Sequence, residues 1–135
     1  APITGVVLVT TPQEVALSDA IKAMNMFLLP QINVPILGVV ENMAWFTPAE
    51  LPDNKYFIFG QGGGKKLALE SHSVLLGQVP LVQSIREGGD EGKPAVLQTG
   101  TQVSEAFMNV AKNTLRQIGV RNEMMAPTQV VRMGE

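Results

Sequence analysis

A glycine-rich stretch followed by two lysines is the part of this sequence in which residue types and spacing most suggest chemistry. It reads FGQGGGKK over residues 59–66, after a short apolar run and before a predicted helix. Glycines that free backbone N–H groups, followed by lysine at a helix start, are what a phosphate-binding loop needs. The stretch therefore raises the question of whether this chain binds a nucleotide, and where.

The spacing of this stretch does not fit the known nucleotide-binding loops. A Walker-type loop reads G-x-x-x-x-G-K-[ST], but counting from Gly60 places Lys65 at the second glycine and Leu67 at the hydroxyl position. The dinucleotide pattern G-x-G-x-x-G fails as well, because it also needs glycine at residue 65. The remaining interpretation is a structural turn in which glycines permit positive φ before a helix that starts near Leu67.

Composition restricts the function classes. The 135 residues carry a net charge of −2, with 45% hydrophobic and 16% charged residues, which excludes a disordered polyelectrolyte. Ten basic against twelve acidic residues give no footprint for nucleic acid, and no apolar run approaches the ~20 residues of a membrane span. With no cysteine and only His72 as histidine, no metal ligand set is predicted. We expect a cytoplasmic protein without a membrane or nucleic-acid partner.

Hydrophobic periodicity predicts an α/β fold: a mostly parallel sheet with helices on both faces. The first predicted strand has the unbroken apolar pattern of a central strand, and Thr11 with Glu14 suggests a capping box for the helix that follows. The predicted strands are residues 5–9, 34–40 and 73–80, and residues 55–59 are predicted as a short strand or extended segment. The predicted helices are residues 11–30, 67–70 and 101–118, and the predicted loops are 42–54 and 81–92. The domain is predicted over 1–118, followed by an irregular tail over 119–135.

Ligands of such sheets bind outside the carboxyl ends of the strands. One residue there, Asn42, carries an amide that matches the N6/N7 edge of adenine, although an asparagine after a strand is more often a turn residue bonded to its own backbone. Pro80 and Leu81 follow the last strand in the same way. In the loop beyond, Arg86 and Asp90 are expected to pair with each other at small energetic gain.

Several segments, taken in order, resemble the Mrp-type ATPases, which are P-loop proteins related to MinD and ParA that act as iron–sulfur cluster carriers. They are VTTPQ, VENM, IFGQGGGKK and SIREGGD, within residues 4–100. In that family the Walker A lysines, switch regions and magnesium ligands precede the VTTPQ strand. The resemblance therefore implies that this chain is the C-terminal part of a P-loop domain, lacking the Walker A and switch segments, and that it is catalytically inactive in isolation.

The resemblance also implies roles for particular residues. Asn42 is the adenine-contacting asparagine, Pro80, Leu81 and Val82 form the loop against the base, and Arg86 is a further adenosine-side candidate. No residue is assigned as catalytic. ATP and magnesium are implied for the full-length protein, together with a homodimer and iron–sulfur client proteins.

The sequence departs from this family at one place. Many members carry a C-x-x-C pair where residues 46–57 read FTPAELPDNKYF, so an iron–sulfur cluster held by that chemistry is not expected here. Two alternatives to an ATP-using cluster carrier follow. One is a non-enzymatic α/β interaction module, and the other is a positioning ATPase of the MinD/ParA kind.

Overall fold

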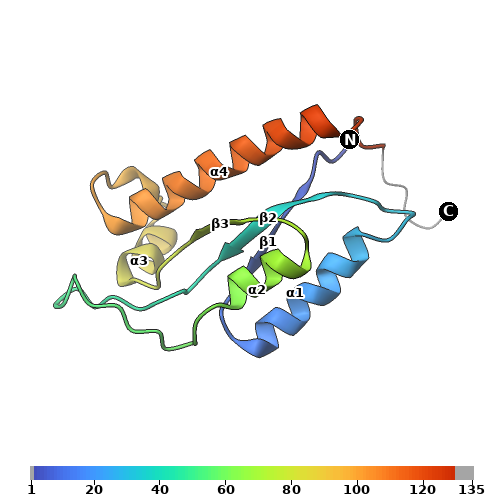
Figure 1. Cartoon of the computed structure of the whole chain (residues 1–135). Helices are drawn as coiled ribbons and strands as arrows, with labels where there is room; N and C mark the ends of the chain where they lie inside the picture. The colour runs from blue at the N-terminus through green and yellow to red at the C-terminus, as the bar shows by residue number, and fades with distance from the viewer. Residues whose placement is uncertain (1, 130–135) are drawn as a thin grey trace.

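The computed structural model describes residues 2–129, which fold around a three-stranded parallel sheet (Figure 1). The strands lie in the order β1 (Val6–Thr10), β2 (Ile36–Glu41) and β3 (Leu75–Gln78). Both neighbouring pairs are parallel, so each connection between strands crosses a face of the sheet. The predicted α/β class and parallel sheet are therefore confirmed.

Helices cover both faces of the sheet, as predicted (Figure 1). One face carries α1 (Glu14–Phe27) and α2 (Gly63–Glu70), and the other carries α4 (Gln102–Met124). Between β3 and α4 come α3 (Gln83–Glu91) and the short 3-10 helix η1 (Ala95–Leu97). None of the helices in residues 2–129 is both long and apolar enough to cross a membrane.

The strand side chains alternate between two apolar cores. Val39 of β2 faces α1 and α2, where it packs with Leu8 and Leu67. Its neighbour Val40 faces α4, where it packs with Leu76. Because β2 has a helix layer on each side, both sets of side chains must be apolar, which explains the continuous apolar run in the sequence.

The first strand differs from its prediction as a covered central strand. Within residues 2–129, β1 pairs only with β2 and lies at the edge of the sheet. The side chain of Val9 is 62% exposed, although it belongs to an apolar strand. An apolar strand edge of this kind is ordinarily covered in a native protein.

The start of α1 and the end of α4 differ from their predictions. The predicted capping box is wrong, because α1 begins at Glu14 with Gln13 as N-cap and has no side-chain cap, while Thr11 Oγ1 donates to Gln13 Oε1. The last helix continues to Met124 instead of ending at residue 118, and Arg121 on the added turns is buried and donates to the Thr4 carbonyl at 2.8 Å. The irregular tail thus begins at residue 125, and residues 130–135 lie outside the described part.

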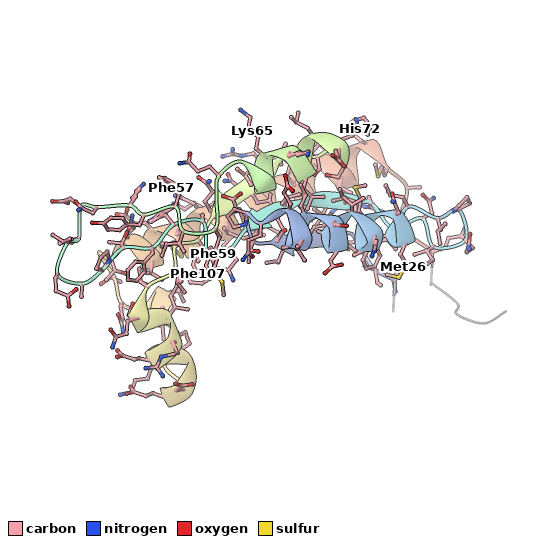
Figure 2. The ribbon with its side chains drawn as sticks, turned by 90° about the horizontal axis from the view of Figure 1, so that it is seen from below. Met26, Phe57, Phe59, Lys65, His72 and Phe107 are labelled. Atoms are coloured by element: carbon pink, nitrogen blue, oxygen red, sulfur yellow. The ribbon has the colours of Figure 1, made fainter. Side chains whose placement is uncertain are left out.

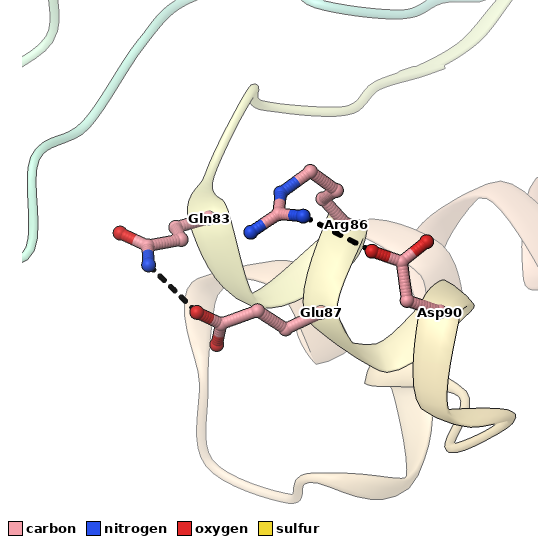
Figure 3. A network of polar contacts seen from close by, with 4 residues as sticks. All are labelled: Gln83, Arg86, Glu87 and Asp90. Carbon is pink, nitrogen blue, oxygen red and sulfur yellow. Dashed lines mark hydrogen bonds and ion pairs between the residues drawn. The ribbon is translucent and has the colours of Figure 1, made fainter.

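A further prediction is wrong. The loop predicted at 81–92 contains α3, in which Gln83 bonds Glu87 and Arg86 pairs with Asp90 at 3.0 Å, both four residues apart (Figure 3). The short strand or extended segment predicted at 55–59 makes a single antiparallel bridge, between residues 46 and 56. The expected pairing of Arg86 with Asp90 is confirmed.

Candidate functional site

The segments that follow the three strands are joined at the carboxyl edge of the sheet. The N–H of Asn42, just after β2, donates to the carbonyl of Thr10 at the end of β1 (2.7 Å). The N–H of Leu81, beyond β3, donates to the carbonyl of Trp45 (2.7 Å). The residues named at this edge from the sequence therefore lie on neighbouring segments of chain.

A buried carboxylate lies at the centre of this edge. Glu41, the last residue of β2, is only 2% exposed. Its Oε2 accepts a hydrogen bond from the Gly64 N–H at 2.6 Å, and its Oε1 accepts one from Gln78 Nε2 at 2.9 Å. Glu41 therefore links β2 to the end of β3 and to the first turn of α2.

Glu41 supplies the cap that α2 lacks in its own sequence. The N-cap of α2 is Gly62, which has no side chain to accept a hydrogen bond and adopts left-handed φ at 86°. Helix N-termini carry free N–H groups and a partial positive charge, and both favour an anion. Because Glu41 accepts the hydrogen bond of the Gly64 N–H, this N–H at the start of α2 is not available to a phosphate.

Two glycines of the stretch are explained by the close approach of α2 to the segments that end β1 and β2. The helix starts at Gly63, four residues earlier than predicted, so the second half of the stretch forms the first helical turn. Before it, Gly60 and Gly62 have positive φ (92° and 86°), as the turn interpretation predicts. A Cβ on Gly63 would lie 2.7 Å from the Pro12 carbonyl oxygen, and one on Gly64 would lie 2.7 Å from the Glu41 Cβ. Glycine is needed here because α2 rests directly on the ends of β1 and β2.

The two lysines of the stretch do not converge on this edge. Lys65 and Lys66 are exposed, and Lys65 projects outward from α2 in Figure 2.

We expect the double variant Lys65→Gln/Lys66→Gln to change the affinity of the full protein for ATP by less than about twofold, because exposed lysines are poor anion sites. Isothermal titration would measure this. A loss of about tenfold or more, with an unchanged melting temperature, would mean that the stretch binds phosphate after all.

Asn42 makes the hydrogen bond to the neighbouring backbone that is expected of an asparagine in a turn. It is half-buried, and its Oδ1 accepts a hydrogen bond from the Met43 N–H at 2.9 Å. Its Nδ2 has no hydrogen-bond partner among residues 2–129. The amide therefore keeps a donor for a ligand, and its acceptor would have to be shared with Met43.

The residues after β3 differ in what they can offer. Pro80 is almost completely buried, so its ring is not available to a ligand. Leu81 and Val82 are half-buried, and Val82 is the extended N-cap residue of α3. Arg86 lies one turn further on, exposed and paired with Asp90, and within the described residues no hydrogen bond or ion pair links it to Asn42.

Two residues hold this edge together, Glu41 and Gln78. The rule that ligands bind beyond the strand ends points to the Glu41–Asn42 pair, but no role was predicted for either Glu41 or Gln78. Both are the last residues of their strands, and each interrupts an apolar run. A carboxylate at the end of a strand that is buried on both faces must find hydrogen-bond donors, which is a signal for such a role. The donor on the glycine stretch lies 23 residues away in sequence, so only the fold identifies it.

Comparison with known proteins decides the family. A sequence model described as ParA, NUBPL iron-transfer P-loop NTPase, matches residues 1–115. The chain belongs to the NUBPL iron-transfer P-loop NTPase family. An iron-sulfur cluster carrier protein of Synechocystis sp. is 47% identical over 112 residues, which cover 82% of this chain and 31% of that protein.

Solved structures of MinD share the fold. The cell division ATPase MinD of Pyrococcus furiosus superimposes with a TM-score of 0.59 at 26% identity, covering 82% of this chain and 41% of that one. MinD of Pyrococcus horikoshii, solved as a complex with Mg-ADP, gives a TM-score of 0.58 at 24% identity, covering 87% and 44%. The fold is therefore that of the MinD-like P-loop NTPases, and the resemblance noted in the sequence is confirmed.

This NUBPL-family chain spans about a third of the length of the curated relatives that it matches.

Proposed function

We propose that this chain is the nucleotide-base-binding part of a P-loop protein that uses ATP in iron–sulfur cluster assembly or transfer. The observation that carries the proposal is the carboxyl edge of the sheet, where the free Nδ2 of Asn42 lies on the segment next to Leu81 and Val82. The Asn42 amide would bind the adenine edge, and the half-buried Leu81 and Val82 would lie against the ring. When bound, ATP supplies the phosphoanhydride bond whose hydrolysis drives the cycle.

The phosphates and magnesium are assigned to segments outside this chain. The Gly64 N–H at the start of α2 is bonded to Glu41, and within residues 2–129 no cluster of three or more His, Cys, Asp or Glu residues is placed to hold a metal. Within residues 2–129 the outer edge of β1 has no partner strand, and a further strand of the same protein would pair there. We therefore expect the isolated chain to be catalytically inactive.

The proposal extends to the iron–sulfur cluster and to the partner proteins. With no cysteine in this chain, a bound iron–sulfur cluster needs ligands from elsewhere, so the cluster is treated as cargo for client proteins. A homodimer is supported by the consecutive exposed apolar side chains of Tyr56, Phe57 and Ile58, which lie in the excursion between β2 and α2. A cytoplasmic location is part of the same proposal.

The substitution Asn42→Ala in the full-length protein tests the base-binding role. It should weaken ATP binding by about 1–3 kcal/mol, because the adenine edge loses its hydrogen bonds to the amide. Isothermal titration with ATP measures the loss, and thermal unfolding shows whether the fold is intact. Asn54→Ala, which removes an exposed asparagine from the loop after β2, is the matched control and should leave the affinity unchanged.

The alternative of a non-enzymatic interaction module predicts a different result. In that case Asn42 is only a turn residue, and Asn42→Ala would leave the ATP titration unaltered or reveal no ATP binding by the parent protein. Either outcome would refute the base-binding assignment.

A further inference from the structure

A groove of about 430 Å³ runs along the free edge of β3, on the opposite side of the sheet from β1. One wall is β3 itself, and the other is α4, which lies beside it (Figure 1). The α4 residues in this wall recur at helical spacing, so they form one face of the helix. They are Gln102, Glu105, Ala106, Asn109 and Asn113.

Among residues 2–129, the strand wall has no partner strand on its groove side. The N–H of Val39 bonds the carbonyl of residue 74, and the carbonyl of Glu41 accepts from residue 79. Their register partners on β3 are Leu75 and Gln78, each one residue away from those bonds, and the ladder has an irregularity between Val39 and Val40 that leaves Leu76 without a register partner. In a parallel ladder such residues point their own N–H and C=O groups away from the neighbouring strand. The backbone of Leu75 and Gln78 therefore faces the groove.

The helix wall and the end of the groove add side-chain groups. Asn113 Nδ2 donates to the Leu76 carbonyl at 2.8 Å, which ties α4 to β3 beside the open edge. At the end nearest the loop, Lys55 Nζ lies 4.2 Å from the centre of the Trp45 ring. Trp45 Nε1 is buried without a hydrogen-bond partner, alone among the side-chain polar atoms of the described residues. Buried indole N–H groups normally have an acceptor.

We propose that this groove binds an extended polypeptide segment of a partner protein, which adds as a strand to the free edge of β3 and places an acidic side chain beside Lys55. An extended peptide is the ligand whose own N–H and C=O groups match an open strand edge. The amides on α4 bond its polar side chains, and the ammonium of Lys55 attracts a carboxylate. The proposal does not depend on nucleotide binding, because the groove lies along the side of β3.

The probe is an acetylated and amidated heptapeptide of alternating threonine and valine that ends in aspartate, titrated into the ¹⁵N-labelled full-length protein. Two matched peptides replace the aspartate with asparagine or the central residue with proline. The indole N–H resonance of Trp45, identified with Trp45→Phe, and the amides of Leu75 and Gln78 should shift with the parent peptide. The asparagine peptide should bind about fivefold more weakly, since a charge-assisted contact is lost. The proline peptide should not bind.

Two charge variants with opposite expected effects on the affinity for the peptide distinguish this site from unspecific binding. Lys55→Gln should weaken the aspartate peptide about fivefold, whereas Glu105→Gln, which removes a negative charge from the facing wall, should bind it at least as tightly as the parent protein. Asn109→Trp should block the groove, and Met108→Trp, on the same helix outside the groove wall, should not.

The proposal is overturned if the Leu75 and Gln78 amides do not shift at millimolar peptide. It is equally overturned if the proline peptide binds as well as the parent peptide, or if N-acetyl-aspartate amide alone reproduces its affinity, since the groove would then be a site for a small anion.

Discussion

Replacing Glu41 with alanine is expected to lower the free energy of unfolding by about 3–5 kcal/mol. The side chain is 2% exposed and accepts from both the Gly64 N–H and Gln78 Nε2. Alanine would leave both donors unpaired, remove the anion at the start of α2 and create a small cavity. No other single side chain in the described structure joins β2, β3 and α2 in this way.

Urea unfolding of the full protein, followed by circular dichroism, measures this loss. Glu41→Gln should lose roughly half as much, because it keeps the shape and one acceptor but not the charge. Glu50→Ala, in an exposed position of the loop, should stay within about 0.5 kcal/mol of the parent protein. A Glu41→Ala protein that is equally close to the parent would show that the carboxylate does not hold the edge together.

Gly64→Ala is expected to destabilise the protein by about 1–3 kcal/mol, although alanine is the better helix former. The added Cβ would lie 2.7 Å from the Glu41 Cβ and 3.1 Å from Leu75 Cδ1. Because β2 and β3 hold these atoms, the added methyl group would have to push α2 away from the sheet. The hydrogen bond between Glu41 and the helix start would lengthen as a result.

Gly89→Ala is the matched control for this prediction. Gly89 is also inside a helix, but a Cβ there meets nothing within 4 Å. The substitution should stabilise the protein by up to about 1 kcal/mol through helix propensity. Thermal unfolding of the two variants should therefore give shifts of opposite sign. If both alanines raised the melting temperature, the close approach of α2 to Glu41 would be wrong.

The part of the fold that depends on local pattern could be predicted from the sequence. The apolar runs of β1, β2 and β3 and the stripe on α4 gave the layers correctly, because burial on both faces leaves a continuous apolar signal. The rule that ligands bind at the carboxyl edge led to Asn42 and to Pro80 and Leu81, which the fold places on neighbouring chain segments, and the family resemblance added Val82.

The part that depends on distant contacts could not be predicted. The start of α2 in a run of glycines is set by Glu41, and helix propensity alone argues against it. The helix α3 contains Gly88 and Gly89, which are typical of a loop, and the i,i+4 pairs that support it are individually weak. The exposed edges of β1 and β3 are properties of the sheet order and leave no mark in the sequence of either strand.

The most direct test of the account is a pair of titrations on the full protein and its Asn42→Ala variant, one with ATP and one with tripolyphosphate, which has no base. If this chain binds adenine while other segments bind the phosphates, the variant should lose about fivefold or more in affinity for ATP and nothing for tripolyphosphate. Equal ATP affinity of the two proteins would contradict the central claim, and so would a parallel loss for tripolyphosphate.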